Sequence, residues 1–252
     1  MTSRDGAANG WVLETRGLTK RFGGLVAVDG LPLAVRPREV RGLIGPNGSG
    51  KTTTVNLLSG LYRADAGEIR LLGERIDRLR PHEITARGVA RTFQTPKLFG
   101  NMTVLENVLV PALAALDRGG GRPRAEILDG ARRLLEFVTL DPLRHALAKE
   151  LSGGQSMLLQ IARGLMVQPM HLFLMDEPFA GVHPTIKDTI METIVRMNRE
   201  EGVTFVIVSH EMATLRRLCP RVSVMHEGKL IAEGSFEEIA NHAGVLEAYL
   251  GR

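Results

Sequence analysis

One stretch decides the fold: Gly45-Pro46-Asn47-Gly48-Ser49-Gly50-Lys51-Thr52. It fits the pattern G-x-x-x-x-G-K-[ST], whose glycines let the backbone bend around a phosphate with no side chain in the way. The N–H groups of the loop and of the following helix then point at the anion. The lysine of this pattern reaches the β- and γ-phosphates, and the hydroxyl of its last residue binds Mg²⁺. Lys51 and Thr52 are therefore candidate ligands of a nucleotide and of Mg²⁺, and Thr53 joins the candidate nucleotide-binding set.

The residues on either side of this loop support the interpretation. Val40–Ile44 is a short apolar run that predicts a buried strand, and residues 53–58 predict a helix. A strand before the loop and a helix after it form the context in which the pattern binds phosphate. The sequence therefore predicts an α/β fold.

A second apolar strand, Leu172-Phe173-Leu174-Met175, ends in two acids, Asp176 and Glu177. Such a run is typical of a strand buried on both faces of a parallel sheet, and ligands bind at the carboxyl ends of such strands. Asp176 can hold Mg²⁺ through oxygen and water ligands, and Glu177 can act as the general base for an attacking water. Alone, the pair is more simply a solvated cap before Pro178, but downstream of a phosphate loop the catalytic interpretation is favoured.

Two further segments complete a set of motifs. Leu151-Ser152-Gly153-Gly154-Gln155 is a polar, glycine-rich turn before an apolar-periodic helix, and residues 203–208 predict a buried strand that ends at Ser209-His210. Together with the phosphate loop, Gln94 and the Asp176/Glu177 strand, these segments follow the motif order of the ATP-binding cassette (ABC) family. The chain resembles this family over nearly everything from Trp11 onward.

The resemblance implies a P-loop NTPase fold with a RecA-like core, an antiparallel β lobe and a helical subdomain. We expect a single ABC ATPase domain over residues 11–252. The core and β lobe are predicted at 11–95 and 151–235, the helical subdomain at 96–150 and a C-terminal helical tail at 236–252. Residues 1–10 are predicted to be a flexible tail.

The resemblance also implies ATP as the ligand, Mg²⁺ as its cofactor, and roles for three more residues. Phe22 stands where the family has an aromatic residue that stacks on adenine, and the alternative is a core phenylalanine. Gln94 would bind Mg²⁺ or the attacking water, and the alternative is a turn residue. His210 would contact the γ-phosphate and orient the water, and the alternative is a polar strand end.

The signature residues, which are Ser152, Gly153, Gly154 and Gln155, lie far along the chain from Lys51. In the family, two domains meet head to tail, so that the signature of one chain faces the γ-phosphate bound by the other. The resemblance therefore implies a second ABC ATPase subunit, identical or paralogous, and a dimer that ATP closes and hydrolysis releases.

Three segments indicate the kind of cassette protein. Arg91-Thr92-Phe93-Gln94, Leu98-Phe99 and Met102-Thr103-Val104-Leu105-Glu106-Asn107 resemble the ATPases of branched-chain amino acid importers, the LivG type, and the ending Tyr249-Leu250-Gly251 fits as well. The run from Asp176 to Val182 looks equally like the lipopolysaccharide-export ATPase, and a urea-importer subunit is a third alternative.

The implied partners are transmembrane permease subunits and, indirectly, a substrate-binding protein, at the cytoplasmic face of the inner membrane. A different class, a soluble cassette protein acting on nucleic acid or ribosomes, typically carries two cassettes or a long coiled coil. This chain has one cassette and no sustained heptads.

Composition sets outer limits on the function. The 252 residues are 44% hydrophobic and 24% charged with a net charge of +4, which is typical of a soluble globular protein. Only 4% are aromatic and no basic run occurs, which argues against nucleic acid as a partner. Cys219 is the only cysteine, so we expect no disulfide, no Cys-rich zinc site and a reducing compartment. The longest apolar run, residues 108–116, contains Pro111 and is too short to cross a membrane.

Local patterns predict further elements. Turns are expected at Gly23-Gly24, Asp29-Gly30 and Ala66-Gly67, and a helix leading into a strand that ends at Gln94 is expected within residues 80–94. Thr103 with Glu106 and Ser235 with Glu238 are capping boxes that begin helices. Residues 118–123 predict a break, followed by an amphipathic helix with Ile127, Ala131, Leu134, Leu135 and Val138 on one face. Residues 222–225 and 230–232 predict a hairpin.

Three positions complete the expectations. His183 occupies a slot where the family usually has Asp, so communication between two ATP sites is expected to differ. Ser156-Met157-Leu158 replaces the basic and polar residues common after the signature. Leu98 and Phe99 are predicted to line a groove for a short permease helix, the alternative being that Phe99 anchors the core of the helical subdomain.

Overall fold

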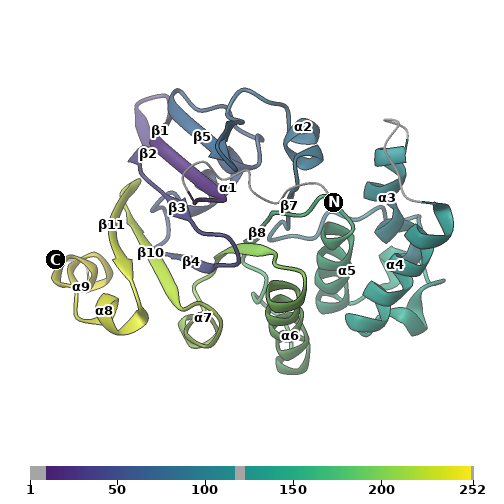
Figure 1. The fold of residues 1–252 in the computed structure, drawn as a ribbon. Helices are drawn as coiled ribbons and strands as arrows, with labels where there is room; N and C mark the ends of the chain where they lie inside the picture. The colour runs from purple at the N-terminus through teal and green to yellow at the C-terminus, as the bar shows by residue number, and fades with distance from the viewer. Residues whose placement is uncertain (1–9, 117–122, 251–252) are drawn as a thin grey trace.

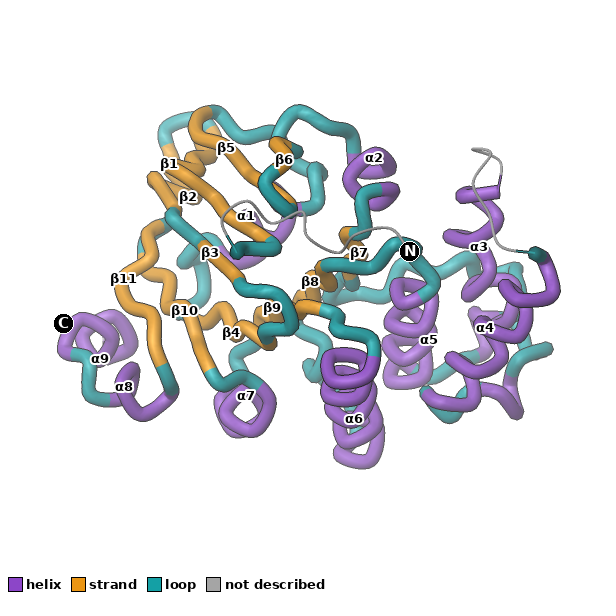
Figure 2. The backbone as a smooth tube through the Cα atoms, viewed as in Figure 1, coloured by secondary structure: helices purple, strands orange, loops and turns teal. Residues whose placement is uncertain are grey.

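The computed structural model describes residues 10–116 and 123–250 and shows two β-sheets flanked by helices (Figures 1 and 2). Residues 1–9 of the predicted tail and 118–122 of the predicted break lie outside the described residues. Within the described ranges, none of the helices has the length and apolar character needed to cross a membrane.

The larger sheet has six strands, in the order β11 (Lys229–Gly234), β10 (Arg221–His226), β4 (Val40–Ile44), β9 (Thr204–Val208), β8 (Leu172–Asp176), β7 (Val89–Arg91). The strands from β10 to β7 are parallel, and β11 pairs with β10 antiparallel at the edge. Since parallel strands end at the same edge, the residues that follow β4, β8, β9 and β7 are brought together there.

Alternation along the strands divides the interior into two cores. In β8, Phe173 and Met175 pack into the core shared with helices below the sheet in Figure 1, whereas Leu172 and Leu174 pack into the core under the second sheet. Successive side chains of a strand point to opposite faces, so an entirely apolar strand belongs where both faces are covered. The prediction of a doubly buried strand before Asp176 is confirmed.

The second sheet is the predicted antiparallel β lobe. It consists of β1 (Leu13–Phe22), β2 (Leu25–Leu31), β3 (Ala34–Val35), β5 (Ala66–Leu71) and β6 (Glu74–Arg75). The strands β2, β3 and β5 all pair with β1 antiparallel. Figure 1 shows this sheet above α1 (Lys51–Leu58), which lies between the two sheets.

Two of the three predicted turns are wrong. The Gly23-Gly24 turn joins β1 to β2, but Asp29-Gly30 lies inside β2 and Ala66-Gly67 begins β5. Gly30 and Gly67 have φ angles of 61° and 86°, and the β1 ladder shifts register opposite both segments. A glycine with positive φ serves a β-bulge as well as a turn, so residue type alone does not separate the two.

The remaining helices surround the larger sheet. They are α2 (Pro81–Ala86), α3 (Val104–Leu116), α4 (Arg124–Phe137), α5 (Gly153–Leu165), α6 (Pro184–Glu200), α7 (Met212–Leu218), α8 (Phe236–Ala240) and α9 (Ala243–Leu250). Figure 1 shows α6 and α7 under the sheet, α3 to α5 together at one side and α8 and α9 beside β11.

Several local predictions in this helical part are confirmed. Thr103 and Glu106 exchange side-chain and backbone hydrogen bonds at the start of α3. Ser235 and Glu238 do the same at α8. The predicted hairpin is β10–β11. The predicted apolar face of α4 and the residue after it is buried except for Leu134, which is partly buried. The boundaries 96–150 proposed for a helical subdomain stay a prediction.

The strand predicted to end at Gln94 stops three residues earlier, at Arg91. Thr92 still donates a backbone hydrogen bond to Leu174 of β8, at 2.9 Å. At Phe93, both the N–H and the carbonyl bind the Gln160 side chain of α5 instead of a strand. A distant side chain therefore ends the ladder, which no local pattern around Gln94 indicates.

Candidate functional site

The phosphate loop joins the end of β4 to α1 and is braced from inside the chain. The Ser49 N–H bonds to the Pro46 carbonyl at 3.2 Å, and the Ser49 carbonyl accepts the Gly228 N–H of the β10–β11 turn at 3.1 Å. A Cβ added at Gly50 would lie 2.3 Å from the Ala27 carbonyl oxygen, and Gly50 has a φ of 101°. Only glycine fits that position, because the backbone passes β2 too closely for any side chain.

The start of α1 fits an anionic ligand. Gly50 precedes the helix in the left-handed conformation and supplies no capping side chain. The first-turn N–H groups of a helix have no partner within the helix, and here no side chain of the preceding residue satisfies them. Asn47 and Gly48 at the tip of the loop are exposed. The loop and helix start therefore present backbone donors as a phosphate requires.

Lys51 lies buried at the base of the loop. Its Nζ donates to the carbonyls of Gly45 and Pro46, at 2.8 and 2.9 Å. Burial lowers the pKa of Lys51, while the nearby carboxylates Glu177 and Asp176 act in the opposite direction. The cation is thus held at the loop that would receive a phosphate.

Asp176 and Thr52 provide oxygen ligands suited to Mg²⁺. The Thr52 hydroxyl lies 3.4 Å from Asp176 Oδ1, and burial raises the pKa of Asp176, against the lowering effect of Arg91. Among the described residues no three His, Cys, Asp or Glu side chains gather into a metal site. One carboxylate and one hydroxyl match the way Mg²⁺ is held when a substrate phosphate and waters complete its shell.

Glu177 and His210 form a contacting pair. Glu177 follows β8 with a φ of 50°, an uncommon backbone conformation for a residue other than glycine, and its N–H donates to the Val208 carbonyl at 2.8 Å. His210 Nδ1 lies 3.0 Å from Glu177 Oε2, and the His210 N–H donates to the same oxygen at 3.4 Å. A strained backbone such as that of Glu177 persists where the surrounding structure enforces it, and such residues are concentrated at functional sites.

Gln94 and Phe22 are both exposed. Gln94 lies in the loop that follows β7, at the edge of the sheet shared by the other candidates. Phe22 is 43% exposed at the end of β1, and its ring meets Tyr62 edge-to-face with centroids 5.3 Å apart. The core interpretation of Phe22 is therefore wrong, whereas stacking on a base stays a prediction. Tyr62, which sequence reasoning missed, adds a second exposed ring beside it.

The signature residues open α5. Ser152 is the N-cap, and it and Gln155 satisfy each other's backbone N–H in a capping box. Ser152 and Gly153 are exposed. The helix packs against α3, α4, α6 and β7, whereas α1 packs against β2 and β8. The structure thus places the signature and the phosphate loop on two helices whose main packing partners differ.

His183 has a local structural role. It is the N-cap of α6, and its Nδ1 accepts the Thr185 N–H at 3.4 Å. An imidazole nitrogen thereby replaces the carboxylate or hydroxyl oxygen usual at this position.

Two residues near the site, Arg91 and Tyr249, were not predicted from the sequence to contact it. The Arg91 guanidinium donates to Asn56 and Ser59 and lies 3.9 Å from Asp176 Oδ2. Burial raises the pKa of Tyr249 in α9, and the nearby Gly45 backbone of the phosphate loop acts in the opposite direction. Both contacts join segments far apart in the chain.

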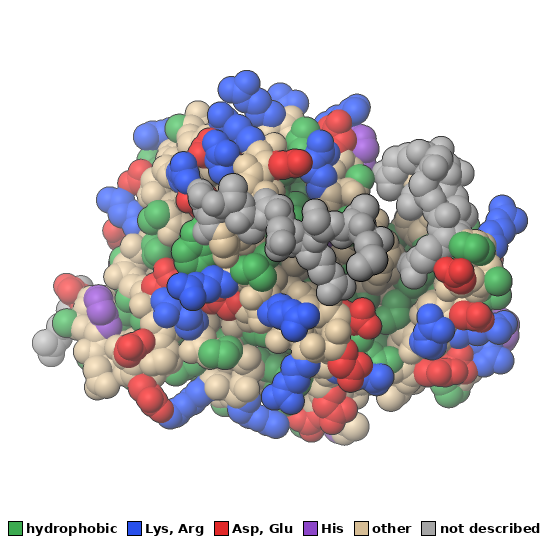
Figure 3. Space-filling view, viewed as in Figure 1, with side chains coloured by type: hydrophobic (Ala, Val, Ile, Leu, Met, Phe, Trp, Pro, Cys, Tyr) green, Lys and Arg blue, Asp and Glu red, His purple; other side chains and the backbone are tan. Residues whose placement is uncertain are grey.

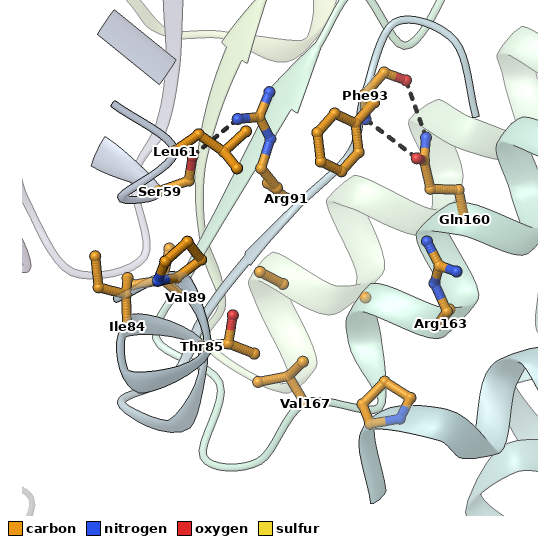
Figure 4. Close-up of a pocket in the computed structure, with 14 residues that line it drawn as sticks. Ser59, Leu61, Ile84, Thr85, Val89, Arg91, Phe93, Gln160, Arg163 and Val167 are labelled. Atoms are coloured by element: carbon orange, nitrogen blue, oxygen red, sulfur yellow. Dashed lines mark hydrogen bonds between the residues drawn. The ribbon is translucent and has the colours of Figure 1, made fainter. Parts of the chain in front are cut away.

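A hollow of about 220 Å³ opens between α2 and β7 on one side and α3 and α5 on the other (Figure 4). Its lining is mostly apolar, and Arg91, Gln160 and Arg163 also contribute to it. Leu98 and Phe99 are absent from this lining, and their predicted place in a groove for a permease helix stays a prediction. Phe99 is 49% exposed, which excludes it as a core anchor, and the Arg163 guanidinium lies 5.8 Å from its ring centre.

Comparison with protein families gives two matches. Residues 28–180 match the family described as ABC transporter. Residues 229–252 match the family described as branched-chain amino acid ATP-binding cassette transporter.

Named relatives match over nearly their whole length. The chain is 41% identical over 247 residues to a probable branched-chain amino acid transport ATP-binding protein LivG of Archaeoglobus fulgidus, covering 95% of each chain. It is 39% identical to the high-affinity branched-chain amino acid transport ATP-binding protein BraF of Pseudomonas aeruginosa, with 95% and 98% covered. It is 36% identical to LivG of Escherichia coli K12, with the same coverage.

Solved structures share the fold. A nucleotide-free ATP-binding cassette from an ABC transporter superposes with a TM-score of 0.83 at 35% identity, covering 96% of this chain and all of that one. The ADP conformation of a cassette gives 0.82 at 35% identity, with 96% and 99% covered. A dimeric cassette bound to ADP and phosphate in a post-hydrolysis state gives 0.79 at 26% identity, with 88% and 98% covered.

Proposed function

This chain belongs to the ATP-binding cassette family of transporter ATPases, and on that premise we propose that it is the ATP-hydrolysing subunit of a branched-chain amino acid importer. The observation that carries the substrate class is the match of residues 229–252, which form β11, α8 and α9, to a family described by that substrate. The full-length relatives named for the same transport support it. The lipopolysaccharide-export and urea-import alternatives are outcomes of the test below.

In the proposed reaction, the phosphate loop and Lys51 bind the ATP phosphates, and Phe22 stacks on the adenine. Thr52, Gln94 and Asp176 would hold Mg²⁺, which neutralises phosphate charge when bound. Glu177, held by His210 at 3.0 Å, takes the proton of the attacking water as the water oxygen bonds to the γ-phosphorus, and the bond from that phosphorus to the bridging oxygen breaks, so that ADP and phosphate are released. His210 would contact the γ-phosphate and orient that water.

The ATP site is proposed to be completed by a second subunit, identical or paralogous. The different main packing partners of α5 and α1 support this, together with the exposure of Ser152 and Gly153, which leaves the signature accessible to another chain. The family acts as dimers with transmembrane permease subunits, and a cassette of the same fold has been solved as a dimer.

A crosslink tests the head-to-tail arrangement. Ser49 is 2% exposed, so the exposed Asn47 is the better partner position for the signature residue. Chains with Asn47→Cys and chains with Ser152→Cys should crosslink when mixed with ATP in a Glu177→Gln background. Burial raises the pKa of the native Cys219 thiol to about 12, so it does not compete. Equal crosslinking with and without ATP would contradict a dimer that ATP closes.

The permease is proposed to insert a short helix into the hollow between α2, β7, α3 and α5. Leu61 lines this hollow and is 45% exposed, and an equally exposed residue, Leu246 at 47%, lies on α9. Leu61→Arg should weaken co-purification of the permease and leave ATP hydrolysis by the isolated subunit unchanged. Leu246→Arg is the matched control and should leave both unchanged. The subunit would then lie at the cytoplasmic face of the membrane, held there by its partners.

The transport assignment is tested by recovering the partners. The tagged chain is purified from membranes of its own organism, the co-purifying membrane subunits are identified, and the complex is reconstituted in vesicles with its substrate-binding protein. We expect ATP-dependent uptake of leucine, isoleucine or valine. Uptake of urea or extraction of lipopolysaccharide instead would replace the substrate assignment. Recovery of ribosomes or DNA without a permease would instead assign the chain to the soluble cassette proteins. Figure 3 shows basic and acidic side chains interspersed on the visible face, without the basic patch that nucleic-acid binding favours.

The hydrolytic role is tested by Glu177→Gln. Loss of a positioned general base typically costs about 10²–10⁴-fold in rate, and we expect that loss in kcat with ATP binding retained. The variant should accumulate as an ATP-bound dimer in gel filtration. Near-normal hydrolysis by the purified variant would refute the assignment.

A further inference from the structure

The loop that carries Gln94, residues 93–97, is closed at its base by a single side chain. Oε1 of Gln160 accepts the N–H groups of Phe93 and Lys97, each at 3.2 Å, and its Nε2 donates to the Phe93 carbonyl at 3.0 Å. Figure 4 shows the two bonds between Gln160 and Phe93. Both ends of the Gln94 loop are therefore attached to one amide.

The burial of Gln160 makes this attachment specific. The residue is 1% exposed, although it carries a polar amide on a helix whose other inward residues are apolar. Leaving a buried amide unpaired costs about 1–3 kcal/mol, so the loop and the amide hold each other in one arrangement. Arg163 adds a second tie on the same helix, donating to the Lys97 carbonyl at 2.6 Å.

The helix that holds the loop is also the helix that begins at the signature. Ser152 caps α5, and Gln160 lies eight positions later, about 12 Å along the axis at 1.5 Å per residue. A helix with an intact capping box moves as a unit, so a displacement of the Gln94 loop displaces Ser152 as well.

Thr92, the residue just before the loop, is bonded to the sheet that carries the catalytic candidates. Thr92 donates to Leu174 of β8, and the Thr92 hydroxyl accepts the Asp176 N–H at 3.2 Å. The loop thus spans from the residue that would hold Mg²⁺ to the helix whose signature would face the partner's ATP.

We infer that Gln160 is a positioning residue that makes the Gln94 loop and the signature helix move together, so that nucleotide bound at one site sets the position of Ser152 for the other. This inference rests on the proposed function, since it concerns ATP bound between two such subunits. It assigns to Gln160 a role distinct from core packing, because the contacts that matter are hydrogen bonds to a loop.

Three variants separate the two roles. Gln160→Leu removes all three hydrogen bonds at similar volume. Gln160→Glu keeps the two acceptor bonds that close the loop and should retain coupling. Ile161→Ala, at a fully buried apolar position of the same helix, is the control for lost stability.

Coupling is read as a distance. Spin labels are placed at His82→Cys on α2 and Arg132→Cys on α4, two exposed positions on either side of the loop, in a Glu177→Gln background. ATP with Mg²⁺ should shift the distance between the labels in the parent, in Gln160→Glu and in Ile161→Ala. It should not do so in Gln160→Leu, which still binds ATP with parental affinity. In the hydrolysing background, Gln160→Leu should lower kcat about tenfold with an unchanged KM for ATP.

The outcomes are distinguishable. An equal shift in Gln160→Leu, no shift in the parent, or a shift lost equally in Ile161→Ala overturns the inference. Failure of every variant to bind ATP overturns the proposed function instead. If Gln160→Leu does not fold, hydrogen exchange on the native chain decides: ATP should change protection at residues 93–97 and 152–156 together, and a response of one segment without the other overturns the inference.

Discussion

The phosphate loop and the Gln94 loop meet at the same edge of the sheet, yet they are held in different ways. The phosphate loop is fixed mainly by its own residues: Lys51 binds the carbonyls of Gly45 and Pro46, six and five positions away. The Gln94 loop is fixed by Gln160 and Arg163, more than sixty positions away. One loop is a local structure, and the other takes its shape from a helix of a different part of the fold.

The difference matches the work proposed for each loop. A loop that binds phosphate benefits from rigidity, because donors already in place need no reordering when the anion arrives. A loop that reports on the nucleotide must be able to shift, and one tied to a second element passes that shift on. Changes in the phosphate loop should therefore affect binding, and changes in the Gln94 loop should affect turnover and coupling.

Among the variants that test this comparison, Lys51→Ala should have the largest effect, and the effect should be on ATP affinity. A lysine about 4 Å from a phosphate charge contributes up to about 4 kcal/mol at an effective dielectric of 20, partly offset by desolvation of the lysine. We expect ATP affinity to fall by about 10²-fold or more in calorimetry. Lys97→Ala, an exposed lysine of the other loop, is the control and should leave affinity unchanged. If Lys51→Ala binds ATP with the affinity of the parent, the proposed role of the phosphate loop in binding is wrong.

Gln94→Ala should show the opposite pattern. Hydrogen bonds to charged groups contribute about 1.5–3 kcal/mol, which corresponds to roughly 10–100-fold in rate. We expect kcat to fall within that range while ATP affinity stays the same, as measured by steady-state kinetics together with nucleotide binding. A fall in affinity of the same size would mean that both loops serve binding and would end the contrast.

Ser152→Ala tests the far end of the helix that holds the Gln94 loop. Loss of an N-cap costs about 1 kcal/mol, or a lowering of Tm by roughly 2–4 °C for a protein of this size. Scanning calorimetry of the isolated subunit measures it. Ser156→Ala, one turn further along α5 and not a cap, should change Tm much less. Equal shifts in the two variants would show that the capping box contributes little.

Tyr249→Phe should give the smallest effect. The Gly45 backbone acts to lower the pKa of the Tyr249 hydroxyl, and one weak polar contact of a residue that is 43% exposed contributes about 0.5 kcal/mol. We expect a small decrease in the free energy of unfolding by chemical denaturation and unchanged ATP affinity. A larger loss, or a change in affinity, would show that the phosphate loop depends on α9 and is less local than its other contacts indicate.

Motifs whose conformation depends only on residues close together in the sequence could be predicted from it. The phosphate loop, the doubly buried strand before Asp176 and the capping boxes at Thr103 and Ser235 all depend on residues a few positions apart. The end of β7 and the bulges at Gly30 and Gly67 could not be predicted, because the deciding partner lies on another strand or helix.

The sequence by itself determined the family, the parallel sheet with its phosphate loop and the candidate residues at its edge. It did so because glycine placement, apolar periodicity and the order of motifs are properties of neighbouring residues. Only the tertiary structure decided that Arg91 lies beside Asp176, that Tyr249 reaches Gly45 and that Gln160 closes the Gln94 loop. Each of those contacts joins residues dozens to some two hundred positions apart, and a buried polar side chain finds its partner only when the packing of whole elements brings the two together.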